Sequence, residues 1–287
     1  VWQAYQDYVR RFGAEISIRE FVELYASRGK GAKVKTTKAM DDAFLRASTP
    51  ETRHIAERIE AWNAEQTAEL EQLLFRQRKR LADAERSLRT KSTKKALADQ
   101  RIAMNKIDWA KGKLADLHRT VPEDRDRRIF PGVYAPVMVM EQGRRVIKPM
   151  RYQCRPVGKP AFYDTKYPGT YNARRDNLEG FWKGQFGHTH GVIVCDAFYE
   201  NVSRHKVEGR ELAVGEAEEN VVLEFRPQPR QVMLIACLYS YWQNDSEELW
   251  SFAAITDEPP QEVAAAGHDR CIIPIKEEHL NAWLDPD

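Results

Sequence analysis

The feature that most constrains the fold is a long stretch, residues 50–118, that is almost free of helix-breaking residues. It has no proline after Pro50 and one glycine, Gly112, and is rich in Ala, Glu, Lys, Arg, Gln and Leu. Proline and glycine are the residues least compatible with a helix interior. A polar break, RTKSTKK at residues 89–95, divides the stretch. Apolar residues follow a heptad-like spacing on both sides of it: Leu70, Leu74, Leu81, Ala84 and Leu88, then Leu97, Met104, Ile107, Leu114 and Leu117. This pattern predicts a long antiparallel helical hairpin.

The turn region of this hairpin is strongly basic. Its cationic residues are Arg76, Arg78, Lys79, Arg80, Arg86, Arg89, Lys91, Lys94 and Lys95. Such a run can contact DNA phosphates, or it can be a solvated helix face. The run contains no aromatic residue for base stacking, and this favours the solvated face. Exposed heptads can also pair between two chains, which predicts a homodimer through the hairpin.

Composition limits the classes of function. The net charge is +2, so a nucleic-acid site must be a local patch. No apolar run approaches the roughly 20 residues of a membrane span, and no secretory signal is visible. The cysteines (Cys154, Cys195, Cys237 and Cys271) lack metal-ligand spacing and lie in strand-like settings. We therefore expect a cytoplasmic protein with reduced, buried thiols, and without a metal or another cofactor.

The remainder of the chain predicts an α+β fold. Residues 1–28 have apolar residues at helical spacing. After Pro131 the sequence becomes a series of short β-branched runs separated by turn residues. These runs are VYAPVMVM, GVIVCDAFY, NVVLEF, QVMLIACLY, WSFAAIT and CIIPI. They predict a largely antiparallel sheet, and the segment NVSRHKVEGRELA between two of them is typical of a loop or hairpin.

A set of polar residues lies among these strand-like runs. Asn172 and Arg174 belong to YNAR, Glu200 ends the run FYE, and His268 and Arg270 belong to GHDR. Together they supply an amide, two guanidiniums, a carboxylate and an imidazole, which can hold phosphate and move protons. Each also has a structural alternative. Glu200 can cap a strand or pair with Arg174, the HDR segment can be a buried turn, and Asn172 can stabilise a turn. Two further residues, His188 and His190 (HTH), have no supporting ligand pattern, and we interpret them as structural or surface residues.

In order along the chain, these segments resemble the SRAP family, whose members are called SOS-response-associated peptidases or abasic-site processing proteins. The resemblance rests on VYAPVMVM, PMRYQCRPVG, YNAR, the strand ending in FYE, MLIACLYSYW, SFAAITDEPP, HDR and AWLDP. It covers the chain from about Pro131 to its C-terminal end. The resemblance implies a single domain over residues 1–287, with a β-rich, sheet or barrel catalytic core at residues 121–287 and flanking helices. The helical hairpin is expected to be an insertion at residues 39–120.

The resemblance also implies a function, namely sensing abasic sites in single-stranded DNA during the SOS response to DNA damage. In the family the nucleophile is an N-terminal cysteine, which joins the aldehyde of the lesion as a thiazolidine. The sequence here begins with Val1, and we expect that cysteine upstream of Val1; without it the chain is expected to be inactive. When bound to damaged DNA, the protein is expected at the nucleoid. The resemblance assigns catalytic roles to Asn172, Glu200 and His268, and phosphate contacts to Arg174 and Arg270.

Three further positions follow from the same resemblance. Thr256 lies at the end of the SFAAIT strand, Pro136 is expected beside the lesion, and Tyr152 stands where relatives have Trp and is expected to stack on a base. Departures from the family pattern at Val133, Tyr152 and Tyr239 concern how the neighbouring bases are held. Two other functions stay open: a thiol peptidase that removes its own initiator methionine, and a non-catalytic DNA- or protein-binding adaptor that uses the hairpin.

Overall fold

The structure, a computed structural model, describes residues 9–28, 34–46, 49–245 and 247–286. Its internal contacts define two compact units. Of the described residues, one unit comprises 22–28, 34, 38–46 and 49–128, and the other 9–21, 35–37, 129–245 and 247–286. Within the described part of the chain, no helix combines the length and the apolar character needed to cross a membrane.

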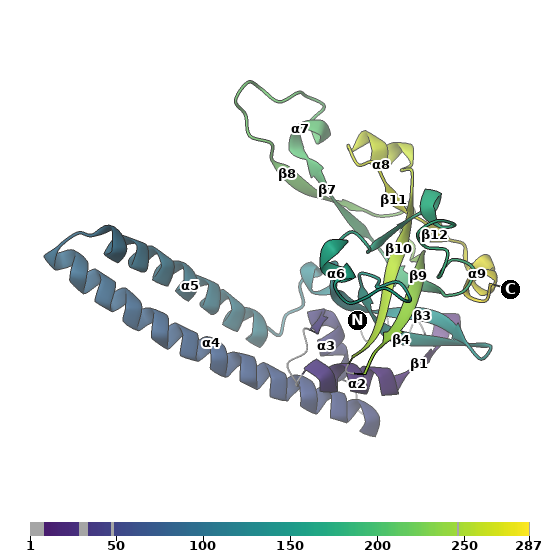
Figure 1. Cartoon of the computed structure of the whole chain (residues 1–287), viewed down its shortest axis with the longest axis horizontal. Coiled ribbons are helices and arrows are strands. Elements are labelled where there is room, and N and C mark those ends of the chain that lie inside the picture. Colours follow the sequence, from purple (N-terminus) through teal and green to yellow (C-terminus); the bar gives the residue numbers. More distant parts are fainter. Residues whose placement is uncertain (1–8, 29–33, 47–48, 246, 287) are drawn as a thin grey trace. The chain divides into compact units, whose positions relative to one another are not determined.

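The first unit contains the predicted hairpin. Helix α4 spans Pro50–Thr90 and α5 spans Lys94–His118, and Figure 1 shows them antiparallel and side by side. Both helices begin at a threonine cap. The Thr49 hydroxyl accepts a hydrogen bond from the Thr52 backbone N–H at 3.3 Å, and the Thr93 hydroxyl accepts one from the Ala96 N–H at 3.1 Å. The prediction of a hairpin that turns within RTKSTKK is therefore confirmed.

The packing of α5 differs from the predicted heptads. The hairpin core contains Leu70 and Leu74 from α4 and Ile107 and Ala110 from α5, with Leu73, Leu81, Leu114 and Leu117 beside them. Leu97 and Met104, predicted to lie inside, are 50% and 49% exposed, whereas Ala96 and Ala103 are buried. The prediction was wrong by one residue in this half of α5. The small alanines thus occupy the contact with α4, and their larger neighbours face solvent.

The rest of the first unit surrounds the start of α4. Helix α2 (Ile18–Arg28) and helix α3 (Lys38–Leu45) are joined by buried polar contacts. Asp41 accepts hydrogen bonds from the Tyr25 hydroxyl and the Arg28 guanidinium, each at 2.8 Å, and Arg28 also lies 3.6 Å from the centroid of the Trp62 ring. A short 3-10 turn, η1 (Asp124–Arg127), follows α5. The helix predicted over residues 1–28 is interrupted, because Gly13 has a φ of +58° and β1 (Glu15–Ile16) precedes α2; residues 1–8 of that prediction lie outside the described residues.

The second unit is built on a closed β-barrel. Its five strands are β3 (Val133–Glu141), β4 (Arg144–Tyr152), β10 (Glu248–Asp257), β9 (Met233–Gln243) and β6 (His190–Cys195), each paired with the next, and β6 pairs back with β3. Four of these seams are antiparallel, and only β4–β10 is parallel. Short β1 and β2 (Lys35–Thr36) extend the sheet. The predicted α+β class with a largely antiparallel barrel core is confirmed.

Alternate residues of the barrel strands pack on opposite faces, as a side-chain period of two requires. The cluster on one face contains Val137, Met150, Ile235, Cys237 and Phe252. The other face packs against α9 (Leu280–Leu284), which follows the turn η3 (Glu277–His279). The strand β4 also buries a charged residue, Lys148, which is only 2% exposed. Its Nζ lies 2.8 Å from a Glu141 oxygen and 4.3 Å from the centroid of the Trp250 ring. A buried ammonium is tolerated here because a carboxylate and an aromatic face replace its hydration.

The edge of β10 changes partner within its length. β4 pairs with β10 up to Tyr152, opposite Phe252, and β5 (Asn172–Arg174) takes over from Ala254. Between them, residues 153–171 leave the sheet and form α6 (Tyr163–Lys166). This excursion is held by Asp164, whose carboxylate pairs with Arg151 at 2.8 Å and with buried Arg155 at 2.5 Å. The chain therefore returns to the same edge of β10 two residues further along, at Ala254 instead of Phe252.

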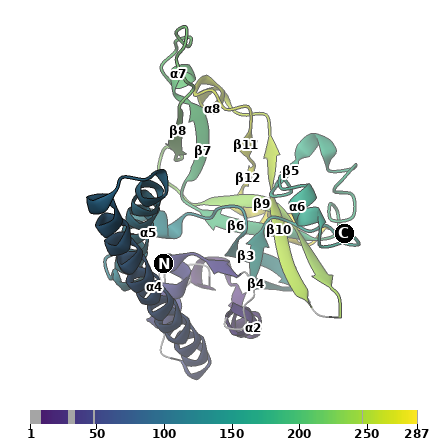
Figure 2. The same ribbon diagram turned by 60° about the vertical axis from the view of Figure 1, so that its left-hand side comes forward.

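The predicted strand GVIVCDAFY is two strands in two sheets. β6 ends at Cys195, and β7 (Phe198–Ser203) pairs with β8 (Asn220–Phe225) in a separate ribbon. Figure 2 shows this ribbon with the short helix α7 (Arg204–Val207) at its end. The continuous apolar run concealed the break, since residues 196 and 197 are not in a strand. The predicted loop or hairpin at NVSRHKVEGRELA begins with the last three residues of β7 and continues through α7 into the connection to β8.

Candidate active site

The polar residues of the candidate site are placed around the end of β10. On one edge, β5 sets Asn172 opposite Ala254 and Arg174 opposite Thr256. On the other edge, β11 (Cys271–Ile272) sets Ile272 opposite Thr256. β11 follows the loop that carries His268 and Arg270, after helix α8 (Gln261–Ala265). The YNAR and HDR segments therefore flank the same strand from its two sides.

Glu200 and His268 form the central contact. Glu200 lies on β7, and its Oε2 is 2.9 Å from His268 Nε2; the two side chains are 23% and 22% exposed. Two segments far apart in the sequence are thus joined at the two groups predicted to transfer protons. Of the structural alternatives considered for Glu200, an ion pair with Arg174 is wrong, because Arg174 is engaged by Asp176.

The imidazole is oriented by the backbone of its own loop. His268 Nδ1 lies 2.8 Å from the carbonyl oxygen of Arg270, and the Arg270 N–H points at the same nitrogen from 3.3 Å. A carbonyl oxygen only accepts, so the shorter contact places the proton on Nδ1. Nε2 then faces the Glu200 carboxyl, and one proton lies between them, on either the nitrogen or the oxygen. The pair is arranged to give and take a proton at the same point.

The surroundings of Glu200 favour its protonated form. Burial raises the pKa of Glu200 above its ordinary value, His268 opposes that shift, and the charge of Asp269 adds to it. Burial disfavours the ionised form of a carboxyl group. A carboxyl with a raised pKa next to an imidazole is suited to general acid–base chemistry near neutral pH.

Gly267 makes room for this contact. It has a φ of +89°, and a Cβ built there would lie 3.0 Å from Cβ of Lys206 on α7. Both the backbone conformation and the close approach of Lys206 require glycine. The residue before His268 therefore lets the His268 loop lie against the end of the β7–β8 ribbon, which carries Glu200.

Each predicted phosphate-binding arginine has an aspartate beside it. Arg174 forms two hydrogen bonds to Asp176, at 3.0 and 2.7 Å, and its side chain is 51% exposed. Arg270 lies 3.8 Å from Asp269. The charge of Asp269 acts on Arg174, and the charge of Arg270 acts on Asp176, so the four groups are neighbours. Sequence reasoning missed the two aspartates as partners, although each lies within two residues of its arginine.

Thr256 is buried at the centre of this region. It is 5% exposed, and its hydroxyl has no hydrogen-bond partner among the residues that the structure describes. A buried hydroxyl without a partner is costly. Thr256 pairs with Arg174 of β5 on one side and with Ile272 of β11 on the other. The unsatisfied hydroxyl therefore belongs to a residue that lies between the YNAR and HDR segments.

For Tyr152 and Pro136, the structure gives no direct contact with the Glu200–His268 pair. The Tyr152 ring stacks on Phe252, with centroids 5.0 Å apart and planes at 15°, and meets the edge of Tyr171 at 5.7 Å. One face of the ring is thus covered, and its stacking on a base stays a prediction. The charge of Glu200 acts on the Tyr152 hydroxyl, whose pKa is raised mainly by burial. Pro136 lies in the barrel wall opposite Pro149, and its role stays a prediction too.

None of the four cysteines of this sequence is arranged as a nucleophile. Burial raises the pKa of Cys154 and of Cys195 to about 12, and raises the pKa of Cys237 well above its ordinary value. Cys271, next to Arg270, also has a raised pKa, through burial and the charge of Glu200. The thiolate is the reactive form, so these environments suppress reactivity.

The histidines of the HTH segment show no metal arrangement. His190 is stacked between Phe186 and Trp283, its Nε2 accepts from the Gly187 N–H, and its Nδ1 donates to the Trp283 carbonyl. With both nitrogens engaged in packing, His190 is a structural residue. Over the described ranges, no group of three or more His, Cys, Asp or Glu side chains is placed to hold a metal ion.

The sequence and the fold are similar to those of known proteins. The family model "SOS response associated peptidase (SRAP)" matches residues 88–287, which reaches further upstream than Pro131. A solved structure from Bacteroides thetaiotaomicron, titled only as a protein of that organism, is similar with a TM-score of 0.46 and 14% sequence identity. The similarity covers 55% of this chain and 66% of that one, just under two thirds of its length. No curated protein matches the sequence.

Proposed function

Because this chain belongs to the SOS response associated peptidase (SRAP) family, we propose that it captures abasic sites in single-stranded DNA as a covalent DNA–protein crosslink. The observation that carries the proposal is the 2.9 Å contact between Glu200 and His268. The nucleophile in this proposal is an N-terminal cysteine that precedes Val1 in the numbering. The buried, high-pKa cysteines of the sequence described above support a nucleophile outside this set.

The chemistry needs several proton transfers at one place. The abasic sugar opens when its hydroxyl loses a proton and its ring oxygen gains one, which leaves an aldehyde. The cysteine amine adds to that aldehyde carbon and water leaves, giving an imine. The thiol sulfur then bonds to the same carbon while its proton passes to the nitrogen, and this closes a thiazolidine. An α-amine titrates near 8, so a neutral fraction is present at neutral pH.

The site residues divide these tasks. Glu200 takes protons from the amine and returns them to the departing water, and His268 protonates the sugar ring oxygen. Asn172 orients the aldehyde through its amide. Arg174 and Arg270 exchange their aspartate partners for the flanking phosphates, which a guanidinium can also bind through two parallel hydrogen bonds. The Thr256 hydroxyl gains a partner on the bound nucleotide.

The test uses the protein with its native N-terminus and an oligonucleotide with one abasic site. Glu200→Gln keeps the size and polarity of the side chain but removes proton transfer. We expect crosslinking, measured on a denaturing gel, to slow by roughly 100-fold or more, the typical contribution of a positioned acid–base group. The control is Glu219→Gln, because Glu219 lies just before β8 and its side chain is 71% exposed. Equal rates for the two variants would refute the proposed role of Glu200.

The family description favours a second function, a peptidase acting on an amide. The same pair can transfer protons to an amide leaving group. Mass spectrometry of the purified protein distinguishes the two. If Glu200→Gln retains its initiator methionine whereas the wild-type protein has lost it, the pair serves peptide cleavage. A Glu200→Gln protein that has lost its methionine but crosslinks slowly shows that the pair acts in crosslinking itself. If neither activity is found and undamaged DNA is still bound, the protein is an adaptor.

A further inference from the structure

The far end of the helical hairpin, which we call the hairpin tip, carries a strong local charge. The hairpin tip is defined as residues 76–95, which contain nine Lys and Arg residues and two carboxylates, Asp83 and Glu85, a net charge of +7. The preceding part of α4, residues 50–75, has six Glu and two Arg residues, a net charge of −4. One helical hairpin therefore combines an acidic base with a cationic tip, in a chain whose total charge is only +2.

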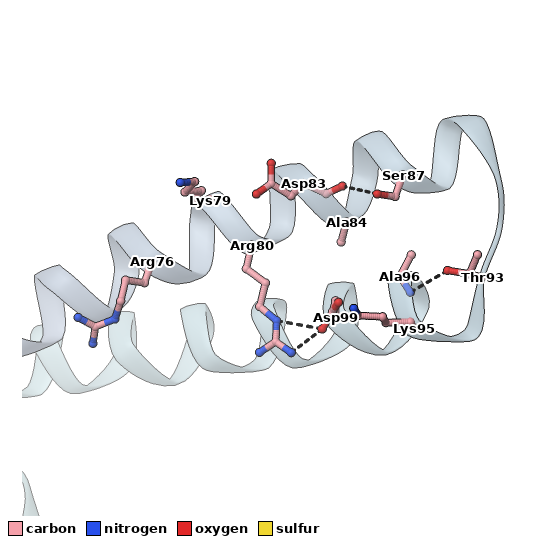
Figure 3. A pocket seen from close by; sticks show the side chains of 10 residues that line it. All are labelled: Arg76, Lys79, Arg80, Asp83, Ala84, Ser87, Thr93, Lys95, Ala96 and Asp99. Carbon is pink, nitrogen blue, oxygen red and sulfur yellow. Dashed lines mark hydrogen bonds and ion pairs between the residues drawn. The ribbon is translucent and has the colours of Figure 1, made fainter.

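Most of these cations are not neutralised within the protein. Figure 3 shows Arg80 reaching from α4 to Asp99 on α5, at 2.5 Å. Arg86 lies 3.7 Å from Asp83. The other seven have no ion-pair partner among the described residues, and all seven are exposed: Arg76, Arg78, Lys79, Arg89, Lys91, Lys94 and Lys95. Lys94 and Lys95 also begin α5, whose first turn has no acidic residue, so they oppose the helix dipole.

An exposed aromatic residue adjoins this charge. Phe75 is 75% exposed and lies three and four residues before Arg78 and Lys79, which makes them neighbours on the surface of α4. Arg86 follows Lys79 by two turns, and Arg89 follows Arg78 by three, so the same side of α4 continues as a basic stripe. The run of basic residues itself contains no aromatic, which is why the sequence favoured a solvated face; Phe75 precedes it by one position.

We propose that the hairpin tip, together with Phe75 directly before it, is a binding arm for single-stranded nucleic acid, in which the basic stripe contacts phosphates and Phe75 stacks on a base. Positive grooves or stripes with exposed aromatics are typical of such sites. The choice of DNA as its physiological ligand rests on the proposed function. The arm itself is independent of the Glu200–His268 chemistry.

The charge and the packing argue against other partners. A helix that lies on a membrane surface needs a broad apolar face, but the apolar stripe of α4 is buried against α5. Among the described residues of the hairpin, the exposed large apolar side chains are few: Phe75, Leu97, Met104 and Trp109. Tip-to-tip pairing of two copies would bring two +7 segments together, which like charges disfavour. A polyanion with exposed bases satisfies both features.

The test compares two variants in which the same amount of charge is removed. The tip variant is R78Q/K79Q/R86Q/R89Q, and the base control is R53Q/R58Q/K111Q/K113Q, which removes four exposed cations from the other end of the same hairpin. Binding of undamaged single-stranded oligothymidine is measured by fluorescence anisotropy across a salt series. We expect the tip variant to bind about tenfold more weakly or worse, with a salt slope lower by about 0.7 for each phosphate that it no longer binds. The base control is expected to stay within about twofold.

A single substitution tests the aromatic. Phe75→Ala is expected to weaken binding by about fivefold or more, as for the loss of one stacked base, with no change in salt slope. The matched control is Trp109→Ala, an exposed aromatic on α5 (55% exposed) outside the hairpin tip. Unchanged thermal midpoints show that all variants are folded.

Three results would overturn the proposal. They are a tip variant that binds as the wild type does, a base control whose affinity falls by as much, and a tip variant that is impaired only in binding to phosphatidylserine vesicles. The proposed function can fail while the arm proposal stands. In that case Glu200→Gln would leave crosslinking unchanged, and the tip variant would still bind undamaged DNA more weakly than the wild type.

Discussion

At the residue scale, the pair of Glu200 and His268 has a measurable consequence for stability. The pKa of Glu200 is raised in the folded protein, so the folded state holds this proton more tightly than the unfolded state does. The group therefore costs stability as the pH rises above the ordinary Glu value of 4.5. Glu200→Gln removes the ionisable group. Relative to the wild type, its free energy of unfolding is expected to increase from pH 4 to pH 7, measured by urea denaturation. A difference that decreases over this range would contradict the raised pKa.

Gly267 makes a second prediction at this scale. An L-residue at a φ of +89°, with Lys206 at 3.0 Å, is strained, and Gly267→Ala is expected to cost about 1–2 kcal/mol of unfolding free energy. Gly184→Ala is the control, since a Cβ at Gly184 meets nothing within 4 Å and its φ is not positive. A similar loss in both variants would show that the conformation of Gly267 is unimportant.

Single residues also show where the sequence was informative about the site. Asn172, Arg174, His268 and Arg270 were identifiable because polar groups stand out between strand-like runs. Their arrangement on both edges of β10 was not, because it depends on β5 and β11 pairing with that strand. Glu200 was identifiable, but its partner was not, since β7 lies in a different sheet from β6.

At the element scale, the α4–α5 contact depends on small residues. Ala103 is fully buried between the helices, whereas its neighbour Met104 is 49% exposed. Ala103→Leu is expected to overpack the contact and to lower the unfolding free energy by about 1–3 kcal/mol. Met104→Leu should change it by less than about 0.5 kcal/mol. Helical circular dichroism during urea unfolding measures both, and the reverse order would restore the heptad register read from the sequence.

The limits of the two hairpin helices could be predicted from the sequence, whereas the limits of the strands could not. Pro50 and the polar break at residues 89–95 are strong local signals, and α4 begins at Pro50 while α5 begins at Lys94, within that break. The phase of α5 was misjudged because Leu97 and Met104 are more apolar than Ala96 and Ala103, whereas the smaller residues occupy the contact with α4. In the strands, an apolar run does not mark where the chain leaves one sheet for another, as at Cys195.

At the scale of the whole molecule, charge distribution matters more than net charge. The hairpin tip carries +7, so the rest of the chain carries −5. The sequence has a pI near 8.3, and at pH 9 the protein is a net anion while its arginines and most lysines stay charged. Binding of single-stranded DNA is therefore expected to persist at pH 9, within a few-fold of its strength at pH 7. A loss of more than about tenfold, in anisotropy measurements at constant salt, would show that net charge controls binding.

The same scale shows how far the sequence could specify the barrel. Alternating apolar runs predicted a largely antiparallel sheet, and the family resemblance implied its class. The closure of the barrel through the parallel pairing of β4 with β10 could not be predicted from local sequence patterns. The two strands are separated by about a hundred residues, and their pairing is set by tertiary packing.

The exchange of partners along β10 bears on aggregation. An unpaired strand edge is a template for joining another chain. From Ser251 to Asp257, β10 is bordered by β4 and then β5 on one side, and by β9 and then β11 on the other. The end of β10 that carries the candidate site is thus kept from pairing with another chain, although the side chains of that site stand beside it. Changes that shorten β5 or β11 should favour self-association of the protein before they abolish its fold.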